Sequence, residues 1–221
     1  MALPAAEFLL LFFVLPALFA YTRHRVPPLT GLWILTAYCL FVMSRDPRFA
    51  AASLWDASAI RLYAARILTL FAGVAVIGIF LVRKFAPREL FFGFPRSQPR
   101  QWGLLMVLYP LLSVYPQGIV YRAFIFERYR DLFRSDWEIV AASALAFTFA
   151  HIVYRNRLAL GLSLLGGLLF AARYLQTGSL LVSSFEHALY GCALFTLGIG
   201  QWFHHASVRH AGAAEAARLV P

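Results

Sequence analysis

Four polar residues lie inside strongly apolar stretches of this sequence, and their side chains could carry out chemistry. His151 lies in the run 141-AASALAFTFAHIVY, His187 follows Glu186 in 180-LLVSSFEHALYGCALF, and Arg122 lies in 115-YPQGIVYRAFIF. An ionisable side chain at membrane depth is energetically costly, so it usually faces a cavity or a partner and marks a functional site. Because buried charges must find partners, we predict that the four side chains share one polar cluster.

The sequence leaves two alternatives open for Arg122. Its neighbours at helical spacing are apolar residues or glycine, so no local carboxylate can pair with it. The guanidinium could extend to the membrane interface. Alternatively, it could point inward and pair with Glu186 or with backbone carbonyls, and this pairing is the arrangement we predict.

The two histidines occupy different surroundings. His151 follows Phe147 by four residues, so both share one helix face and the phenyl ring can orient the imidazole. Glu186 directly precedes His187 and on a helix points about 100° away, toward a different neighbour. A single buried histidine is more often a satisfied core residue than a catalyst. Two on separate apolar segments, with an intramembrane Glu and Arg, indicate a functional cluster.

The composition indicates a membrane protein. The 221 residues are 61% hydrophobic and 14% charged, with a mean hydropathy of +0.69, whereas a soluble domain is about one-quarter charged. The net charge of +10 comes from basic residues in short clusters between apolar runs, which we interpret as loop residues contacting anionic lipid headgroups. Membrane lipids are therefore expected partners. Nucleic acid is not, because no basic face interleaved with aromatic residues is present.

Apolar segments near the roughly 20 residues needed to cross a bilayer predict an all-α, polytopic transmembrane bundle of about eight helices. The expected spans are 3–21, 29–43, 64–82, 102–115, 117–133, 137–154, 158–174 and 180–203. The first is interpreted as a retained helix, because no basic segment precedes it and no small-residue cleavage site follows it. Pro116 separates the fourth and fifth spans, since proline can break the helical hydrogen-bond ladder.

Interfacial segments and a polar tail complete the predicted organisation. Residues 44–63 are typical of a short amphipathic helix at the headgroups, and residues 83–101 are expected to form a proline- and arginine-rich loop on the membrane. We divide the chain into N-terminal helices and interfacial segments (1–100), a core (101–203) and a polar tail (204–221). The distribution of basic loop residues gives a small preference for an outside N-terminus.

The polar residues and their neighbours resemble the CPBP family of intramembrane endopeptidases, which includes the CAAX prenyl proteases and the bacteriocin-processing and self-immunity proteins. The ordered motifs are Q-G-x-x-x-R over 117–122, F-x-x-x-H over 147–151, and 178-GSLLVSSFEHALYG, which contains His187. The likeness extends from about Gln101 to Phe203. It implies a helical bundle around a polar cavity within the membrane.

The chain departs from the family pattern at three positions. In active members the first motif is E-E-x-x-x-R, a glutamate and the F-x-x-x-H histidine activate water, and the second histidine with a later Asn stabilises the oxyanion. Here Gln117 and Gly118 replace the glutamates and Gly191 replaces the Asn. Glutamine can orient water but cannot accept its proton, and general-base help is worth about 10²–10⁴ in rate. Glu186 is the candidate replacement carboxylate.

The resemblance implies an intramembrane endopeptidase, or a catalytically degenerate homologue, in a bacterial inner or plasma membrane, acting on membrane-associated peptides or proteins. Its expected catalytic residues are Gln117, Arg122, His151, Glu186 and His187. The alternative is a non-enzymatic membrane scaffold, an immunity protein, or a small-molecule or lipid permease that reuses the same cavity. No cofactor is expected, and a His/His/Glu metal site is not favoured because the H-E-x-x-H spacing is missing.

Overall fold

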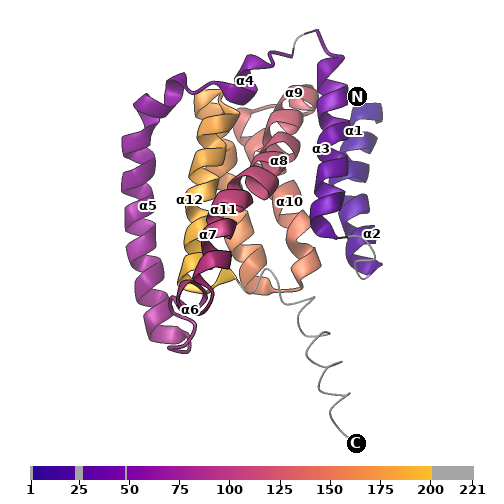
Figure 1. Ribbon diagram of the computed structural model, residues 1–221. Helices are drawn as coiled ribbons and strands as arrows, with labels where there is room; N and C mark the ends of the chain where they lie inside the picture. The colour runs from indigo at the N-terminus through magenta and orange to yellow at the C-terminus, as the bar shows by residue number, and fades with distance from the viewer. Residues whose placement is uncertain (1, 23–26, 48, 201–221) are drawn as a thin grey trace, which may run out of the picture.

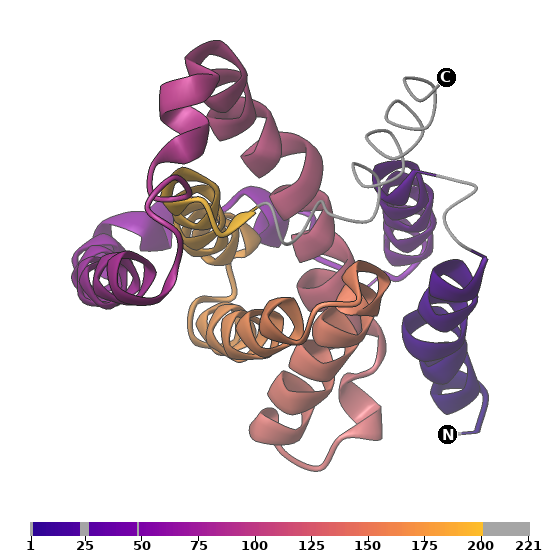
Figure 2. The same cartoon turned by 90° about the horizontal axis from the view of Figure 1, so that it is seen from below.

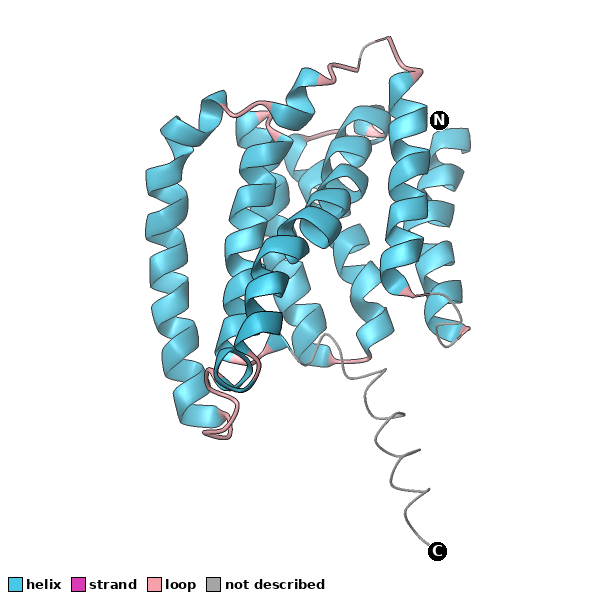
Figure 3. Ribbon diagram, in the orientation of Figure 1, coloured by secondary structure: helices cyan, strands magenta, loops and turns pink. Residues whose placement is uncertain are grey.

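The computed structural model describes residues 2–22, 27–47 and 49–200, and across them the chain contains helices and no strand (Figure 3). Six helices are long and apolar enough to cross a membrane: Leu3–Tyr21, Ser58–Phe85, Pro99–Arg128, Asp136–Tyr154, Arg157–Thr177 and Leu180–Leu197. Pro28–Ser44 is a shorter apolar helix. The predicted all-α, polytopic bundle is therefore confirmed, and the chain is an integral membrane protein.

The helices carry the labels of Figure 1. They are α1 (Ala2–Leu9), α2 (Leu15–Tyr21), α3 (Pro28–Ser44), α4 (Ala52–Trp55), α5 (Ser58–Phe85), α6 (Gly93–Ser97), α7 (Pro99–Tyr109), α8 (Tyr115–Gly118), α9 (Ile125–Arg128), α10 (Asp136–Ala150), α11 (Arg157–Thr177) and α12 (Leu180–Leu197). Wider π-helical turns join α1 to α2 (Leu10–Val14), α7 to α8 (Pro110–Val114) and α8 to α9 (Ile119–Phe124).

Two of the predicted spans, 102–115 and 117–133, are parts of one helix, so the expected break at Pro116 is wrong. The helix runs without interruption from Pro99 to Arg128. A proline ring in an α-helix clashes with the carbonyl four residues earlier. Here the turn before Pro116 is π-helical, and its wider spacing accommodates a missing amide without ending the helix.

Short polar residues cap the starts of the last three helices, and glycines cap the ends of two of them. The side chains of Ser135, Asn156 and Ser179 accept hydrogen bonds from the first free amides of α10, α11 and α12. α11 ends at Gly178 and α12 at Gly198, whose φ values of +62° and +90° favour glycine. These caps make α10, α11 and α12 a sharply bounded unit.

Aromatic packing joins the N-terminal helix to the C-terminal end of the Pro99–Arg128 helix. The rings of Phe8 and Phe12 lie 5.2 and 6.0 Å from that of Tyr129, and Phe12 also meets Tyr121 at 5.9 Å. On the opposite side of α10–α12 lies α5, which contacts α12 (Figure 2). α5 is mostly exposed along its length, which suits a helix whose outer surface meets lipid.

Close backbone contact holds α10 against α11. A Cβ atom at Gly167 would lie 3.0 Å from the Ala144 Cα atom, so glycine is required for this approach. Small residues allow such close contacts between membrane helices, whereas the neighbouring Gly166 faces Phe170 of its own helix.

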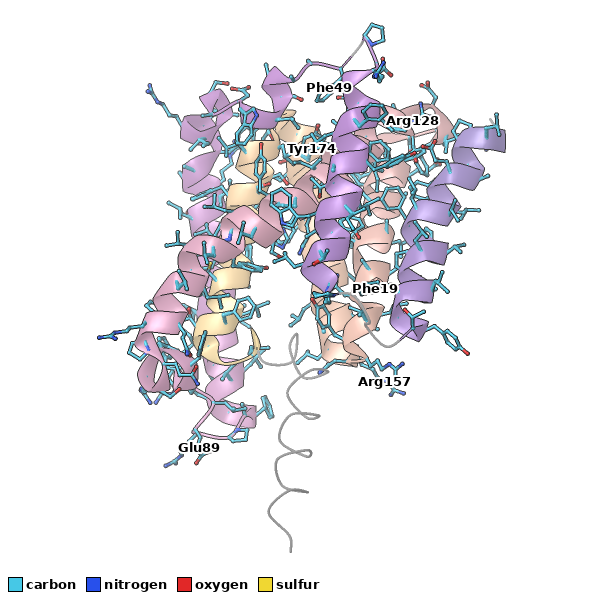
Figure 4. The ribbon with its side chains drawn as sticks, turned by 45° about the vertical axis from the view of Figure 1, so that its right-hand side comes forward. Phe19, Phe49, Glu89, Arg128, Arg157 and Tyr174 are labelled. Carbon is cyan, nitrogen blue, oxygen red and sulfur yellow. The ribbon has the colours of Figure 1, made fainter. Side chains whose placement is uncertain are left out.

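The connecting segments differ in detail from the expectation. Within 44–63 only α4 and the first residues of α5 are helical, and α5 starts at Ser58 rather than near residue 64. Within 83–101 the short helix α6 and the start of α7 replace the expected loop. Figure 4 shows Arg128 at one end of the bundle and Glu89 and Arg157 at the other, as interfacial residues should be. The predicted tail, 204–221, lies outside the described residues.

Candidate active site

A large cavity of about 1900 Å³ lies among the N-terminal helix, α3, α5, α7, α10, α11 and α12. Its walls are mainly aliphatic and aromatic, which is less polar than expected. The polar side chains in its wall include Gln117, His151 and His187, three of the five predicted catalytic residues. Among the described residues, no Asp or Glu side chain lines it.

His151 lies where α10 tightens into the 3₁₀ turn His151–Tyr154. Its backbone amide donates to the carbonyl of Thr148 instead of the usual α-helical partner, Phe147. The ring Nδ1 atom forms a hydrogen bond with the carbonyl oxygen of Phe147 instead, at 2.7 Å. Because a carbonyl oxygen only accepts, Nδ1 carries the proton, and Nε2 of the neutral ring is an acceptor. The local fold thus sets the tautomer that a general base requires.

His187, on α12, is held between two phenyl rings. It stacks on Phe170 at 4.4 Å with an interplanar angle of 20°, and meets the edge or face of Phe147 at 5.5 Å with an angle of 88°. Phe147 also contacts His151, with ring centroids 4.6 Å apart. The two imidazoles therefore lie against the same phenyl ring although they come from different helices.

One ring nitrogen of His187 has no hydrogen-bond partner among the described residues. Its Nδ1 atom is buried and makes no hydrogen bond within the described part of the chain. Leaving a buried polar atom unsatisfied costs about 1–3 kcal/mol. Such atoms are rare in folded proteins, and each calls for an explanation such as a bound water molecule or a catalytic role. His187 is thus a site of unused hydrogen-bonding capacity beside the cavity.

Gln117 lies in the cavity wall, in the short α8 segment between two π-helical turns. Such turns occur frequently at functional sites, because they shift the helix face on which a side chain projects. The side-chain Nε2 of Gln117 donates to the Ser113 hydroxyl at 2.8 Å. This contact orients the amide and leaves its carbonyl oxygen as the group that can accept from a bound molecule.

Arg122 lies inside the protein but behind the cavity wall. Its side chain is 2% exposed, so the alternative of extension to the interface is wrong. One Nη atom donates to the Ser184 hydroxyl at 3.3 Å, and the guanidinium carbon lies 5.8 Å from the ring centroid of Phe170. Its Nε atom has no partner within the described residues. Phe170 links Arg122 to His187, so the two residues belong to one cluster.

The expected pair between Arg122 and Glu186 is not formed. Glu186, fully buried on α12, binds Arg173 of α11 through two hydrogen bonds, Nε to Oε2 at 2.8 Å and Nη2 to Oε1 at 3.2 Å. Arg173 also donates to Gln176, and its guanidinium lies 5.4 Å from the ring of Tyr63. Glu186 therefore points away from the cavity, on the other side of α12, as its 100° offset from His187 allows.

Arg173 was missed because it lies near the end of a helix, where basic residues are common. Arg173 and Glu186 are brought together by the Thr177-Gly178-Ser179 turn between α11 and α12. In an antiparallel helical hairpin, residues at similar distances on either side of the turn face each other. Arg173 and Glu186 stand five residues before and eight after Gly178, so the hairpin geometry could have indicated the pair.

Gly118 and Gly191 are two of the departures from the family pattern. Other side chains occupy the space that a side chain at each position would need. A Cβ atom at Gly118 would lie 2.6 Å from Nη2 of Arg122 and 2.8 Å from Oγ of Ser184. Gly118 therefore faces Arg122, whereas its neighbour Gln117 faces the cavity. A Cβ atom at Gly191 would lie 2.4 Å from the hydroxyl of Tyr109, a residue that the sequence gave no reason to select.

Fold and cavity together define a polytopic helical membrane protein with a histidine-lined cavity between its helices. Residues 99–193 match the family model described as type II CAAX prenyl endopeptidase Rce1-like, and all the motif residues lie inside this range. The resemblance to the CPBP family is thereby confirmed over that segment. Neither the curated proteins nor the solved structures gave a match.

Proposed function

We propose that this protein is a CPBP-type intramembrane endopeptidase of reduced catalytic power, which hydrolyses peptide bonds of membrane-associated substrates. The observation that carries the proposal is the convergence of His151 and His187 on the ring of Phe147 in the wall of one cavity. The match to type II CAAX prenyl endopeptidases supports the reaction class. We place the protein in a bacterial inner or plasma membrane, with lipids and a peptide substrate as its partners and no nucleic acid.

His151 would act as the general base. A water molecule between Nε2 of His151 and the oxygen of Gln117 attacks the substrate carbonyl, and its proton moves to Nε2. When the tetrahedral intermediate collapses, the carbon–nitrogen bond breaks and the same proton passes to the leaving amine. His187 would donate a hydrogen bond to the carbonyl oxygen as charge develops there.

The reaction is expected to be slow, because the cavity wall contains no carboxylate among the described residues. Glu186 cannot supply one in this arrangement, since both of its oxygens are bound to Arg173. A base or proton acceptor is typically worth about 10²–10⁴ in rate. An imidazole working alone retains part of this factor, which leaves a weak but measurable activity.

The test is cleavage of a quenched-fluorescent peptide with a prenylated cysteine near its C-terminus, by the full-length protein in liposomes. We expect slow cleavage that is abolished by His151→Ala and unaffected by a chelator. Thr148→Val, one turn from the same site, is the control for the packing of α10. Cleavage that persists in His151→Ala would reject the proposed role of His151.

A gain of activity is the stronger test. Gln117→Glu places a carboxylate in the cavity wall and should raise kcat by about 10²-fold, the lower range of general-base effects. Gln117→Asn, which changes the length of the side chain and adds no charge, is the control and should not raise it. If neither the wild-type protein nor Gln117→Glu cleaves the peptide, the endopeptidase proposal is wrong and the permease or scaffold alternative gains support.

A further inference from the structure

Tyr109, the last residue of α7, fills the space beside the turn of α12 that follows His187. Gly191 lies one helical turn after His187, and a Cβ atom there would be 2.4 Å from both Cε1 and the hydroxyl oxygen of Tyr109, and 2.7 Å from Cζ. Residues one turn apart on a helix are neighbours, about 5–6 Å between their Cβ atoms. The Tyr109 hydroxyl therefore lies one helical turn along α12 from His187.

The ring of Tyr109 is fixed and its hydroxyl is not engaged. Phe195 packs against the ring at 5.1 Å and 75°, and the backbone of α12 at Gly191 closes another side. Within the described part of the chain, the hydroxyl makes no hydrogen bond to another side chain or to the backbone, and Tyr109 belongs to the cavity wall. Because packing holds the ring in place, only the hydroxyl hydrogen can rotate, and the phenol can donate a hydrogen bond from a fixed position.

Peptide hydrolysis needs such a donor. Negative charge develops on the carbonyl oxygen of the substrate, and hydrogen bonds prepared for this charge often provide the largest contribution to catalysis. Gln117 uses one N–H of its amide group to bind Ser113, and its oxygen is assigned above to the attacking water. His187 can provide one from its ring, and the hydroxyl of Tyr109 is a second donor on the same side of the cavity.

We propose that Tyr109 is a catalytic residue that donates a hydrogen bond to the oxyanion, beside His187. This inference rests on the proposed function. The water oxygen bonds to the carbonyl carbon, the C=O electron pair moves to oxygen, and the water proton goes to Nε2 of His151. Tyr109 keeps its own proton throughout and releases the hydrogen bond when the C=O bond re-forms.

Gly191 and Tyr109 form one unit in this view. The family resemblance assigns an Asn to the position of Gly191, and any side chain there would collide with the phenol. Glycine at 191 therefore makes room for a donor that comes from α7 instead of α12. The absence of the Asn donor and the presence of the Tyr109 hydroxyl in the same space are therefore linked.

The experiment is the kinetics of Tyr109→Phe, measured with the prenylated peptide both in the wild-type background and in Gln117→Glu. Phenylalanine keeps the packing against Phe195, so only the hydroxyl is lost. We expect kcat to fall by about 10²-fold, the typical effect of removing one oxyanion donor, with KM unchanged. The control is Tyr129→Phe, which removes a buried hydroxyl that has no hydrogen-bond partner among the described residues, at a residue outside the cavity wall.

A second pair of variants tests the exchange of donors. Gly191→Asn should abolish activity while Tyr109 is present, and Tyr109→Ala combined with Gly191→Asn should regain part of it. Unchanged kcat in Tyr109→Phe, with cleavage present in either background, overturns the role of Tyr109 and leaves the endopeptidase proposal standing. Absence of cleavage in both backgrounds overturns the two together.

Discussion

Two arginines are buried in this bundle, and they are compensated in different ways. Arg173, between α11 and α12, holds a carboxylate through two short hydrogen bonds. Arg122, close to the cavity, has a serine hydroxyl, the ring of Phe170 and an Nε atom without a partner within the described residues. The charge of Arg173, which joins α11 to α12, is neutralised by the carboxylate of Glu186. The charge beside the candidate site is stabilised only by dipoles.

The glycine at 118 explains the difference. Gly118 faces Arg122 so closely that the guanidinium occupies the place of its absent side chain. In the family pattern this position carries a glutamate four residues before the arginine, and residues at this spacing are neighbours on a helix. Arg173 thus has a carboxylate partner in Glu186, whereas Gly118 offers none to Arg122.

The largest expected effect is on the paired arginine. Glu186→Gln should destabilise the protein by about 3–5 kcal/mol, because removing one member of a buried ion pair leaves the other uncompensated. Arg173→Met combined with Glu186→Leu should recover most of this loss. Thermal unfolding in detergent measures both.

The same measurement separates the two arginines. Arg122→Met and Glu186→Gln should give additive losses when combined, since they do not share a hydrogen bond. Recovery in this double variant would mean that Glu186 also pairs with Arg122, and the contrast between the two sites would then disappear.

A medium effect is expected from giving Arg122 a partner. Gly118→Glu and Gly118→Gln bring nearly the same volume against Arg122 and Ser184, so they share the steric cost. The glutamate variant should be more stable than the glutamine variant by about 2 kcal/mol, the usual gain of a hydrogen bond between charged groups. Equal unfolding temperatures for the two variants would show that Arg122 needs no counter-charge.

The smallest effect concerns Ser184. Ser184→Ala removes the only side-chain hydrogen bond of Arg122 seen among the described residues and should cost about 1 kcal/mol. In the background of Arg122→Met the same change should cost nothing, because the bond is already lost. A cost that stays the same in both backgrounds would assign the effect of Ser184 to packing within α12.

The helices could be predicted well from the sequence, because the signals that end them are local. Gly178 marks the end of α11, and Asn156 and Ser179 mark the starts of α11 and α12. The predicted span 180–203 was too long, because α12 ends before Gly198. The error at Pro116 has a different origin. Whether a proline ends a helix depends on the turn before it, and a π-helical turn leaves no recognisable signature in the sequence.

The candidate site was predictable only in part. The residues Gln117, His151 and His187 line one cavity, which the spacing and the family pattern indicated together. The partner of Glu186 and the proximity of Tyr109 to Gly191 depend on contacts between helices that are 13 and 82 residues apart in the chain. Such contacts leave no trace in the periodicity of a single helix.

The two π-helical turns around Gln117 make the length of this segment as important as its side chains. A regular α-helix turns about 100° per residue, and a π turn places one extra residue in the ring that it closes. Gln117 faces the cavity and Arg122 faces Ser184 only while Ile119–Phe124 keeps its six residues. Deleting one of them would restore regular winding and rotate one residue out of register with the other. The function of this segment therefore depends on the number of residues in its turns as well as on their identity.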